Sequence, residues 1–183
     1  MIYVVIGIII VVLLLAAVGA CYNNLIKLRN IVKDQWAQID VQLKQRADLI
    51  PNIVETVKGY ASHESETLEA VIAARNKAVS STNAHDEMQA NGELSNMLGK
   101  MFALAEAYPD LKANTNFLDL QNQLKSVEEK IAYSRQFYND SVLKYKNKLE
   151  MFPSNIVASM FGFKPEEFFT ASEADKELPK VKF

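Results

Sequence analysis

The sequence predicts an all-α protein: an N-terminal transmembrane helix, then an antiparallel four-helix bundle of long helices with a short C-terminal helical cap. Two observations lead to this fold class. Residues 1–21 carry no charged side chain, so all charges lie on the other 162 residues. Proline and glycine are sparse after this segment, and residues 110–152 contain neither, which permits long helices. The mean hydropathy of −0.05 is thus an average over two dissimilar parts.

The apolar segment has the length of a membrane span. It begins at Ile2 and ends at Ala20, and its 19 residues would form a helix of roughly 28 Å, close to the thickness of a bilayer core. Tyr3 and Tyr22 flank the segment, where aromatic rings prefer the membrane–water interface. A buried core helix seldom runs this far without a charge. We therefore predict a transmembrane anchor over residues 1–21 whose partner is the lipid bilayer.

Two processed forms of the segment are the alternatives. A cleaved signal peptide has a basic region before a shorter apolar stretch, whereas no Lys or Arg precedes this one. A lipoprotein signal is the closer rival, because Val18-Gly19-Ala20-Cys21 loosely resembles a lipobox and lipidation would use the only cysteine. The missing basic residues count against it too. Lipidation of Cys21 stays an alternative that mass spectrometry of the N-terminus can test.

The orientation of the anchor follows from its flanking charges. Lys27, Arg29 and Lys33 follow the apolar segment, and no basic side chain precedes it. Cytoplasmic flanks are enriched in Lys and Arg. We therefore expect a single-pass protein of the cell membrane, with a short N-terminus outside and the helical bundle in the cytoplasm.

Apolar residues in the remaining chain recur at steps of three and four, as in amphipathic helices. The longest stripe is heptad-like, as in a coiled coil. The four stripes are Leu25, Leu28, Val32, Trp36, Ile39 and Leu43; Val54, Val57, Ala61, Leu68, Val71 or Ile72, and Val79; Leu94, Leu98, Met101, Ala105 and Tyr108; and Phe117, Leu120, Leu124, Val127, Ile131, Tyr138, Val142, Tyr145, Leu149 and Phe152. Four such helices with short connections bury their stripes most simply as an antiparallel bundle.

Helix boundaries are predicted from capping residues and proline. Asp48 is expected to cap a helix that holds Pro51 in its first turn, where a missing N–H costs little. Residues 80–83 end this helix, because their side chains compete for backbone hydrogen bonds. Residues 108–110 close the third helix, since the residue before a proline avoids helical geometry.

The last long helix and the junction behind the anchor have their own signals. Asn114 or Asn116 can cap the last helix, and Pro153 ends it. No proline or glycine lies between Gly19 and Pro51. The anchor therefore either continues into the first bundle helix or kinks in between.

Residue types and spacings offer no recognised chemical site. His63-Glu64 begins an H-E-x-x-H pattern, but Thr67 stands where the second histidine is required. Tyr60 and Thr82 stand three residues before the two histidines, where di-iron bundles have glutamate. We therefore predict no catalytic, cofactor-binding or metal-binding residue, no cofactor and no enzymatic activity. His63 is interpreted as a solvated or capping side chain.

Other function classes are disfavoured by composition. The single Cys21 excludes a disulfide framework and is far in sequence from His63, so a Cys–His nucleophile is not expected. The six glycines are scattered and form no phosphate loop. A net charge of −2 gives no electrostatic reason to expect a nucleic-acid partner. Glu55 and its neighbours Glu64, Glu66 and Glu69 are interpreted as a solvated helix face.

Apolar side chains are concentrated after the last long helix. They are Phe152, Ile156, Val157, Met160, Phe161, Phe163, Phe168 and Phe169. We expect them to cap the core of the bundle, with a membrane-apposed or partner-binding patch as the alternative. The polar tail over residues 170–183 is expected to be mobile.

Several ordered motifs of this chain resemble those of the LemA family. They are QWAQIDVQLKQRADLIPN (residues 35–52), VKGYA with the following His-Glu (57–64), AEAYPDLKA (105–113), FYN (137–139) and FPSN (152–155). Where the family usually has two basic residues, this chain has Gln45-Arg46. The likeness extends over nearly the whole chain and makes residues 22–169 a LemA-like bundle.

The resemblance implies bacterial single-pass membrane proteins with a short outer N-terminus, a cytoplasmic helical domain and no established catalytic activity. Polar residues inside the matching motifs are expected to act mostly as helix caps and buried hydrogen bonds, and secondarily as partner contacts. They are Arg46, Asp48, Asn52, Tyr108, Asp110, Asn114 and Asn139.

The function predicted is that of a membrane-anchored, non-enzymatic interaction or scaffold protein at the cytoplasmic face. The alternatives are an accessory subunit that modulates a membrane enzyme, a cofactor-free hydrolase, and a lipid-binding bundle. The expected partners are the bilayer and unidentified proteins, with a second copy of the chain as a candidate. Small residues four apart, Ala16 with Ala20 and Ala17 with Cys21, are a weak signal for helix pairing in the membrane.

Overall fold

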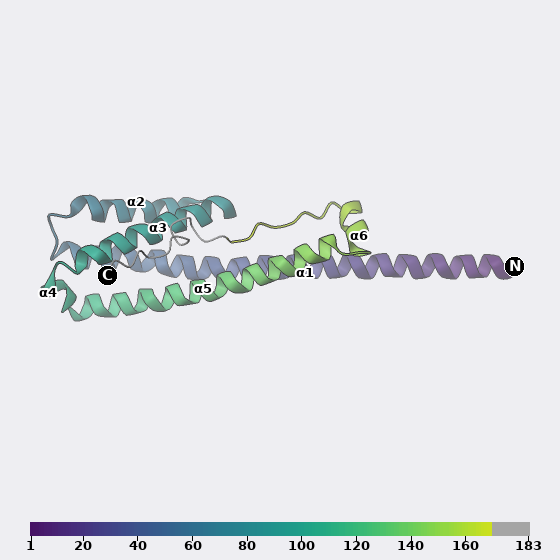
Figure 1. Cartoon of the computed structure of the whole chain (residues 1–183), viewed down its shortest axis with the longest axis horizontal. Helices are drawn as coiled ribbons and strands as arrows, with labels where there is room; N and C mark the ends of the chain where they lie inside the picture. The colour runs from purple at the N-terminus through teal and green to yellow at the C-terminus, as the bar shows by residue number, and fades with distance from the viewer. Residues whose placement is uncertain (170–183) are drawn as a thin grey trace, which may run out of the picture. The chain divides into compact units, whose positions relative to one another are not determined.

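The computed structural model of the chain describes residues 1–169, and the predicted tail over residues 170–183 lies outside them. The described part contains helices and no strand, so the all-α prediction is confirmed. In chain order the helices are α1 (Ile2–Lys58), α2 (Ser65–Ser80), α3 (Ala84–Ala105), α4 (Pro109–Lys112), α5 (Thr115–Glu150) and α6 (Ser154–Met160), as Figure 1 shows.

Helix α1 is a single helix of 57 residues, and it includes the predicted anchor. Of the two alternatives for residues 21–24, the structure has the continuous helix. The most apolar window of α1 has a mean hydropathy of 3.2, and none of it is buried. By length and composition, α1 is the helix in the described residues that could cross a membrane.

The predicted helix start at Asp48 is wrong, because α1 continues through Pro51 to Lys58. A proline inside a helix has no N–H for the carbonyl four residues earlier, which ordinarily breaks the helix at a cost of about 3 kcal/mol. Here that carbonyl belongs to Ala47, and Arg75 of α2 donates its Nε–H to it at 3.2 Å. A side chain from another helix thus replaces the missing backbone donor, and the ring of Pro51 lies on the exposed face.

Most of the other predicted boundaries agree with the structure. The exception is the predicted close of the third helix at residues 108–110, because α3 already ends at Ala105 and Pro109 begins α4. Helix α2 ends at Ser80, and the Asn83 side chain caps α3 by accepting a hydrogen bond from the Asp86 N–H at 2.9 Å. Of the two candidate caps for α5, Asn114 accepts a hydrogen bond from the Phe117 N–H at 3.0 Å. The break that Pro51 was expected to make lies instead in the turns at residues 59–64.

The chain divides into two compact units, and α1 and α5 contribute to both. We call Met1–Ala37 with Gln136–Phe168 the anchor unit, and Gln38–Arg135 with Phe169 the core unit.

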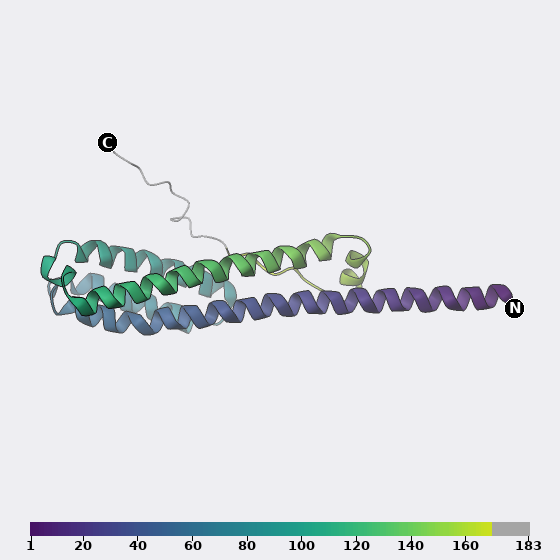
Figure 2. The same ribbon diagram turned by 90° about the horizontal axis from the view of Figure 1, so that it is seen from below.

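In the core unit, residues of α1, α2, α3, α4 and α5 share one apolar cluster. Helices α2 and α3 lie side by side in both views (Figure 1 and Figure 2). The buried members are Ile50, Ile53, Val54, Val57, Ala61, Leu68, Val71, Ala78, Ala90, Leu94, Leu98, Met101, Ala105, Leu111, Phe117 and Leu124. Most of these belong to the predicted stripes. Ile50, Ile53, Ala78, Ala90 and Leu111 are buried although no stripe included them, and Val79, which a stripe did include, is exposed.

In the anchor unit, aromatic residues of α5 and of the segment after it pack on α1. The Trp36 ring contacts Tyr138 edge-on at 5.2 Å between centroids. Tyr138 donates its hydroxyl hydrogen to the Glu167 carbonyl at 2.8 Å. Burial, followed by the charges of Glu166 and Glu167, raises the pKa of Tyr138 to about 12, so the phenol keeps this proton at neutral pH.

The predicted C-terminal cap is correct only in part. Val157 and Phe169 are buried, and Phe163 and Phe168 are half-buried. The prediction is wrong for four residues with large exposed side chains, which are Phe152, Ile156, Met160 and Phe161. Helix α6 instead turns its small residues inward, where Ser154 donates its hydroxyl hydrogen to the carbonyls of Lys148 and Met151 at the end of α5.

Candidate functional site

The most distinctive polar feature of the core unit is Arg46, whose side chain has no exposed surface. Its Nη1 donates to Glu128 Oε1 and to Ser95 Oγ, both at 2.9 Å. Its Nη2 donates to Asn91 Oδ1 at 2.5 Å and to the Asn91 carbonyl at 3.3 Å. A buried cation is tolerated only where such partners replace water. The guanidinium therefore joins α1 to α3 and α5.

The partners of Arg46 are themselves held in place. Asn91 donates from its amide nitrogen to the Glu87 carbonyl at 2.8 Å. Ser95 donates its hydroxyl hydrogen to the Asn91 carbonyl at 3.0 Å. Glu128 remains partly exposed. Because these groups already bond to one another, the expected structural role of Arg46 is confirmed, and Ser95 has its proton engaged rather than poised for nucleophilic attack.

A carboxyl pair lies between the same two helices, α1 and α3. Asp40 and Glu87 share a hydrogen bond between their side chains. Burial first, then the charge of Asp40 and this hydrogen bond, raises the pKa of Glu87 to about 7. Burial also raises the pKa of Asp40, although the hydrogen bond from Glu87 opposes the shift. The pair therefore takes up a proton as the pH falls through about 7. Neither residue was singled out from the sequence, because their contact spans two helices.

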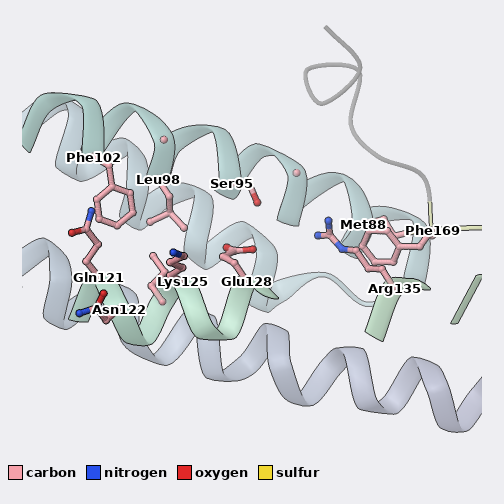
Figure 3. Close-up of a pocket in the computed structure, with 13 residues that line it drawn as sticks. Met88, Ser95, Leu98, Phe102, Gln121, Asn122, Lys125, Glu128, Arg135 and Phe169 are labelled. Atoms are coloured by element: carbon pink, nitrogen blue, oxygen red, sulfur yellow. The ribbon is translucent and has the colours of Figure 1, made fainter. Parts of the chain in front are cut away.

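A cavity of about 700 Å³ lies between α3 and α5 of the core unit (Figure 3). Phe102 and Gln121 lie at one end of it, and Arg135 and Phe169 at the other. The Arg135 guanidinium lies over the Phe169 ring, 4.3 Å from its centroid. The lining comprises Met88, Gly92, Ser95, Leu98, Gly99, Phe102, Gln121, Asn122, Leu124, Lys125, Glu128, Arg135 and Phe169.

The floor of this cavity includes two partners of Arg46, namely Ser95 and Glu128. Apolar and amide side chains surround them together with the basic side chains of Lys125 and Arg135, and this lining contains neither histidine nor cysteine. Such a surface can hold a partner by apolar contacts, hydrogen bonds and charge. A second cavity, of about 530 Å³, lies between the end of α1 and α2 and includes Pro51 and Leu68 in its lining.

The candidate metal ligands of the sequence are not brought together. His63 and His85 are exposed residues of the core unit, and Cys21 is a half-buried residue of α1 in the anchor unit. Among residues 1–169, no group of three His, Cys, Asp or Glu side chains could hold a metal ion.

The motif residues divide into two sets. Tyr108 donates its hydroxyl hydrogen to Glu64 at 3.2 Å, so Glu64 is not simply part of a solvated face. Asn114 caps α5 and also donates to the Tyr60 hydroxyl at 2.8 Å. With Arg46 these are the expected caps and internal hydrogen bonds. The other motif residues are less enclosed: Asp48, Asn52 and Asp110 are exposed, and Asn139 is half-buried.

Comparison with known proteins identifies the family. A model of the LemA family matches residues 35–183. The chain belongs to the LemA family. The resemblance seen in the motifs is thereby confirmed.

Two kinds of relative are similar to the chain, proteins named LemA and magnetosome proteins named MamQ. The Protein LemA of Metamycoplasma hominis is 23% identical, over 84% of this chain and 71% of the relative. The magnetosome protein MamQ 2 of Paramagnetospirillum magneticum is 24% identical, over 93% of this chain and 72% of the relative. The magnetosome protein MamQ of Magnetospirillum gryphiswaldense is 30% identical over a shorter stretch, 44% of this chain and 29% of the relative. With the exposed apolar part of α1, these findings indicate a membrane-associated protein.

Proposed function

We propose that this LemA-family chain is a membrane-anchored interaction protein that has no enzymatic activity and presents its helical domain to the cytoplasm. The observation that supports the proposal most is the state of the polar groups in the core unit. Arg46, Asn91 and Ser95 are hydrogen-bonded to one another, which supports a structural role for these polar groups. Exposed polar residues of the LemA motifs are then available for partners.

The proposed helical domain is an antiparallel four-helix bundle made of α2, α3 and the adjoining parts of α1 and α5. The shared apolar cluster supports this arrangement, as do the short connections at residues 59–64, 81–83 and 106–114. Spin labels at exposed positions of the consecutive helices α2 and α3 test it, with one label at Asn76 near the end of α2 and the other at His85 or Lys100, near the start and the end of α3. In an antiparallel pair the distance from Asn76 to His85 is shorter than the distance from Asn76 to Lys100, and the reverse order contradicts this topology.

The cytoplasmic orientation rests on the basic residues after the span. Lys27 and Lys33 are exposed, and Arg29 is half-buried with its guanidinium 5.4 Å from the centre of the Phe163 ring. A reporter fused after Phe183 that is active only in the cytoplasm should be active in cells. A reporter that is active only when fused outside the cytoplasm would overturn the orientation.

Site-directed photo-crosslinking in intact membranes tests the interaction role. A photoreactive residue at Asn52 or Asp110, which are exposed inside the LemA motifs, should crosslink to a defined partner. Ser126 is the matched control, since it is exposed on α5 outside the motifs. Equal crosslinking from all three positions would contradict a specific surface. Intrinsic turnover of a substrate by the purified chain, lost in Asp110→Asn, would contradict the non-enzymatic role.

A second copy of the chain is a candidate partner through the membrane helix. Ala16 and Ala20 are exposed at a four-residue spacing on α1, and small residues at this spacing let helices approach closely in lipid. Crosslinking through Cys21 in membranes tests this: Ala16→Leu should reduce a disulfide-linked dimer, and Leu13→Ala is the control.

A further inference from the structure

Helix α6 and the residue Phe152 before it expose large apolar side chains that an amphipathic helix in water ordinarily buries. Ser154, Val157 and Ala158 are buried, while Phe152, Ile156 and Met160 are exposed at four-residue spacing. Phe152 is 79% exposed and Met160 is 70% exposed. Large side chains normally turn inward because burying them removes more apolar surface from water. An exposed apolar patch therefore needs an apolar environment.

The position of α6 on α1 shows where this patch lies. Tyr22 packs against Phe161 at 4.9 Å and against Phe163 at 5.5 Å between ring centroids. Figure 1 and Figure 2 both show α6 beside α1. Tyr22 comes two residues after Ala20, the end of the apolar span. The patch therefore lies at the level of α1 where the hydrocarbon core of a bilayer would end.

The charges around the patch favour a lipid surface. Lys144, Lys146 and Lys148 precede it on α5 and Lys164 follows it, with the acidic Glu150 between them and Glu166 and Glu167 beyond Lys164. Lys146 places its ammonium 5.9 Å from the centre of the Phe168 ring. Basic side chains around an apolar patch bind anionic headgroups while the apolar groups enter the acyl boundary.

We propose that α6 and the residues before it form a second membrane contact, which lies in the interface of the leaflet at the C-terminal end of the span. Phe152, Ile156 and Met160 insert at the level of the headgroups and upper acyl chains. The lysines contact anionic lipid headgroups. This inference rests on the proposed membrane anchor and adds an in-plane contact to it.

The test is depth-dependent quenching of tryptophan fluorescence in the full chain. Trp36 is the only tryptophan, so Trp36→Phe removes the background and Phe152→Trp adds one reporter in the patch. The chain is reconstituted in phosphatidylcholine–phosphatidylglycerol vesicles that contain brominated lipids. Bromine near the headgroup should reduce emission by roughly twofold, and bromine near the bilayer centre should reduce it less, as expected for a side chain at the interface.

Phe137→Trp in the same background is the matched control. Phe137 is 60% exposed on α5, next to Tyr138, which contacts Trp36. Position 36 is 16 residues past Ala20, roughly 24 Å along the helix, so bromolipids should leave this reporter unquenched. Met160→Trp is a second reporter in the patch that keeps the test valid if Phe152→Trp folds poorly.

Three results would overturn the inference or its premise. Patch reporters that are quenched no more than Phe137→Trp contradict the lipid contact. Blue-shifted emission without quenching by bromolipid means that protein, such as a second copy, covers the patch, and also overturns the proposal. Flotation of the vesicles distinguishes failure of the membrane anchor from failure of the α6 contact. A chain that does not float with the vesicles contradicts the anchor itself. A chain that floats but has unquenched patch reporters contradicts only the contact of α6.

Discussion

The core unit buries a charged side chain, whereas the anchor unit exposes apolar side chains. The core unit encloses a guanidinium, that of Arg46, and surrounds it with hydrogen-bond acceptors. The anchor unit leaves apolar side chains exposed over residues 2–15 and again around α6. The core unit is therefore organised for water, with both terminal nitrogens of its buried guanidinium hydrogen-bonded inside. The anchor unit is organised for a solvent that accepts apolar surface.

The largest expected effect breaks the anchor. Replacing Ile9 and Leu13 by lysine adds two charges to the middle of the span, at about 2.5 to 3.5 kcal/mol each on insertion scales. This exceeds the few kcal/mol by which the remaining residues favour insertion, so the chain should move from the carbonate-resistant membrane fraction to the soluble or aggregated fraction. Val41→Lys is the control, because Val41 is an exposed apolar residue of the same helix in the core unit. Loss of membrane integration in the control would remove the distinction between the two units.

The next effect concerns the buried charge of the core unit. Arg46→Met leaves the Glu128 carboxylate and the Asn91 amide oxygen without their donor, and the free energy of unfolding should fall by about 3 to 5 kcal/mol. Denaturant unfolding of the chain in detergent micelles, followed by circular dichroism, measures the loss. Lys44→Met, on an exposed position of α1, should change the stability by less than about 0.5 kcal/mol. Equal effects of the two substitutions would show that the burial of Arg46 contributes nothing.

A smaller effect tests the helix around Pro51. Arg75→Leu removes the donor to the Ala47 carbonyl and should cost about 1 to 3 kcal/mol, since a buried acceptor loses its partner. In a Pro51→Ala background the backbone N–H of residue 51 can bond to this carbonyl, so the same substitution should cost less. A double-mutant cycle measures the difference. A coupling energy of zero would mean that Arg75 stabilises α2 and α1 independently of the proline.

The smallest effect is the pH dependence that Glu87 confers. Its pKa is about 7 in the fold, above its ordinary value, so the folded chain binds a proton more tightly than the unfolded chain. The contribution of this bound proton to the free energy of unfolding is fully present below about pH 4.5 and is lost as the pH rises through about 7. The group is partly exposed, so we expect a loss on the order of 1 kcal/mol. Glu87→Gln should remove it.

Comparison of urea midpoints at pH 5 and pH 8 measures this pH effect. The Glu87→Gln chain should gain stability relative to the native chain at pH 8 and not at pH 5. Glu129→Gln, on an exposed position of α5, is the control. A native chain whose midpoint difference equals that of Glu87→Gln would contradict this proton uptake.

Local patterns in the sequence predicted the helices well, because burial repeats every three or four residues within each of them. Features that depend on a second element were harder to predict. The carbonyl that Pro51 leaves without a donor is bonded by Arg75, which is 28 residues after Ala47. The Asp40–Glu87 contact likewise joins α1 and α3. Phe152 and Met160 were expected first to cap the bundle core, as large apolar residues do in water, and their exposure agrees instead with the alternative, a membrane-apposed or partner-binding patch.

The contact between Trp36 and Tyr138 has a practical consequence for spectroscopy. The only indole of the chain lies in the anchor unit, whereas α2 and α3 belong to the core unit and contribute helical ellipticity. Emission excited selectively at the indole band therefore reports on one unit, and far-ultraviolet ellipticity averages over both. Unfolding curves from the two signals coincide if the units unfold together. If the two unfolding curves differ, the signal that changes first shows which unit unfolds first, and the protein needs no label.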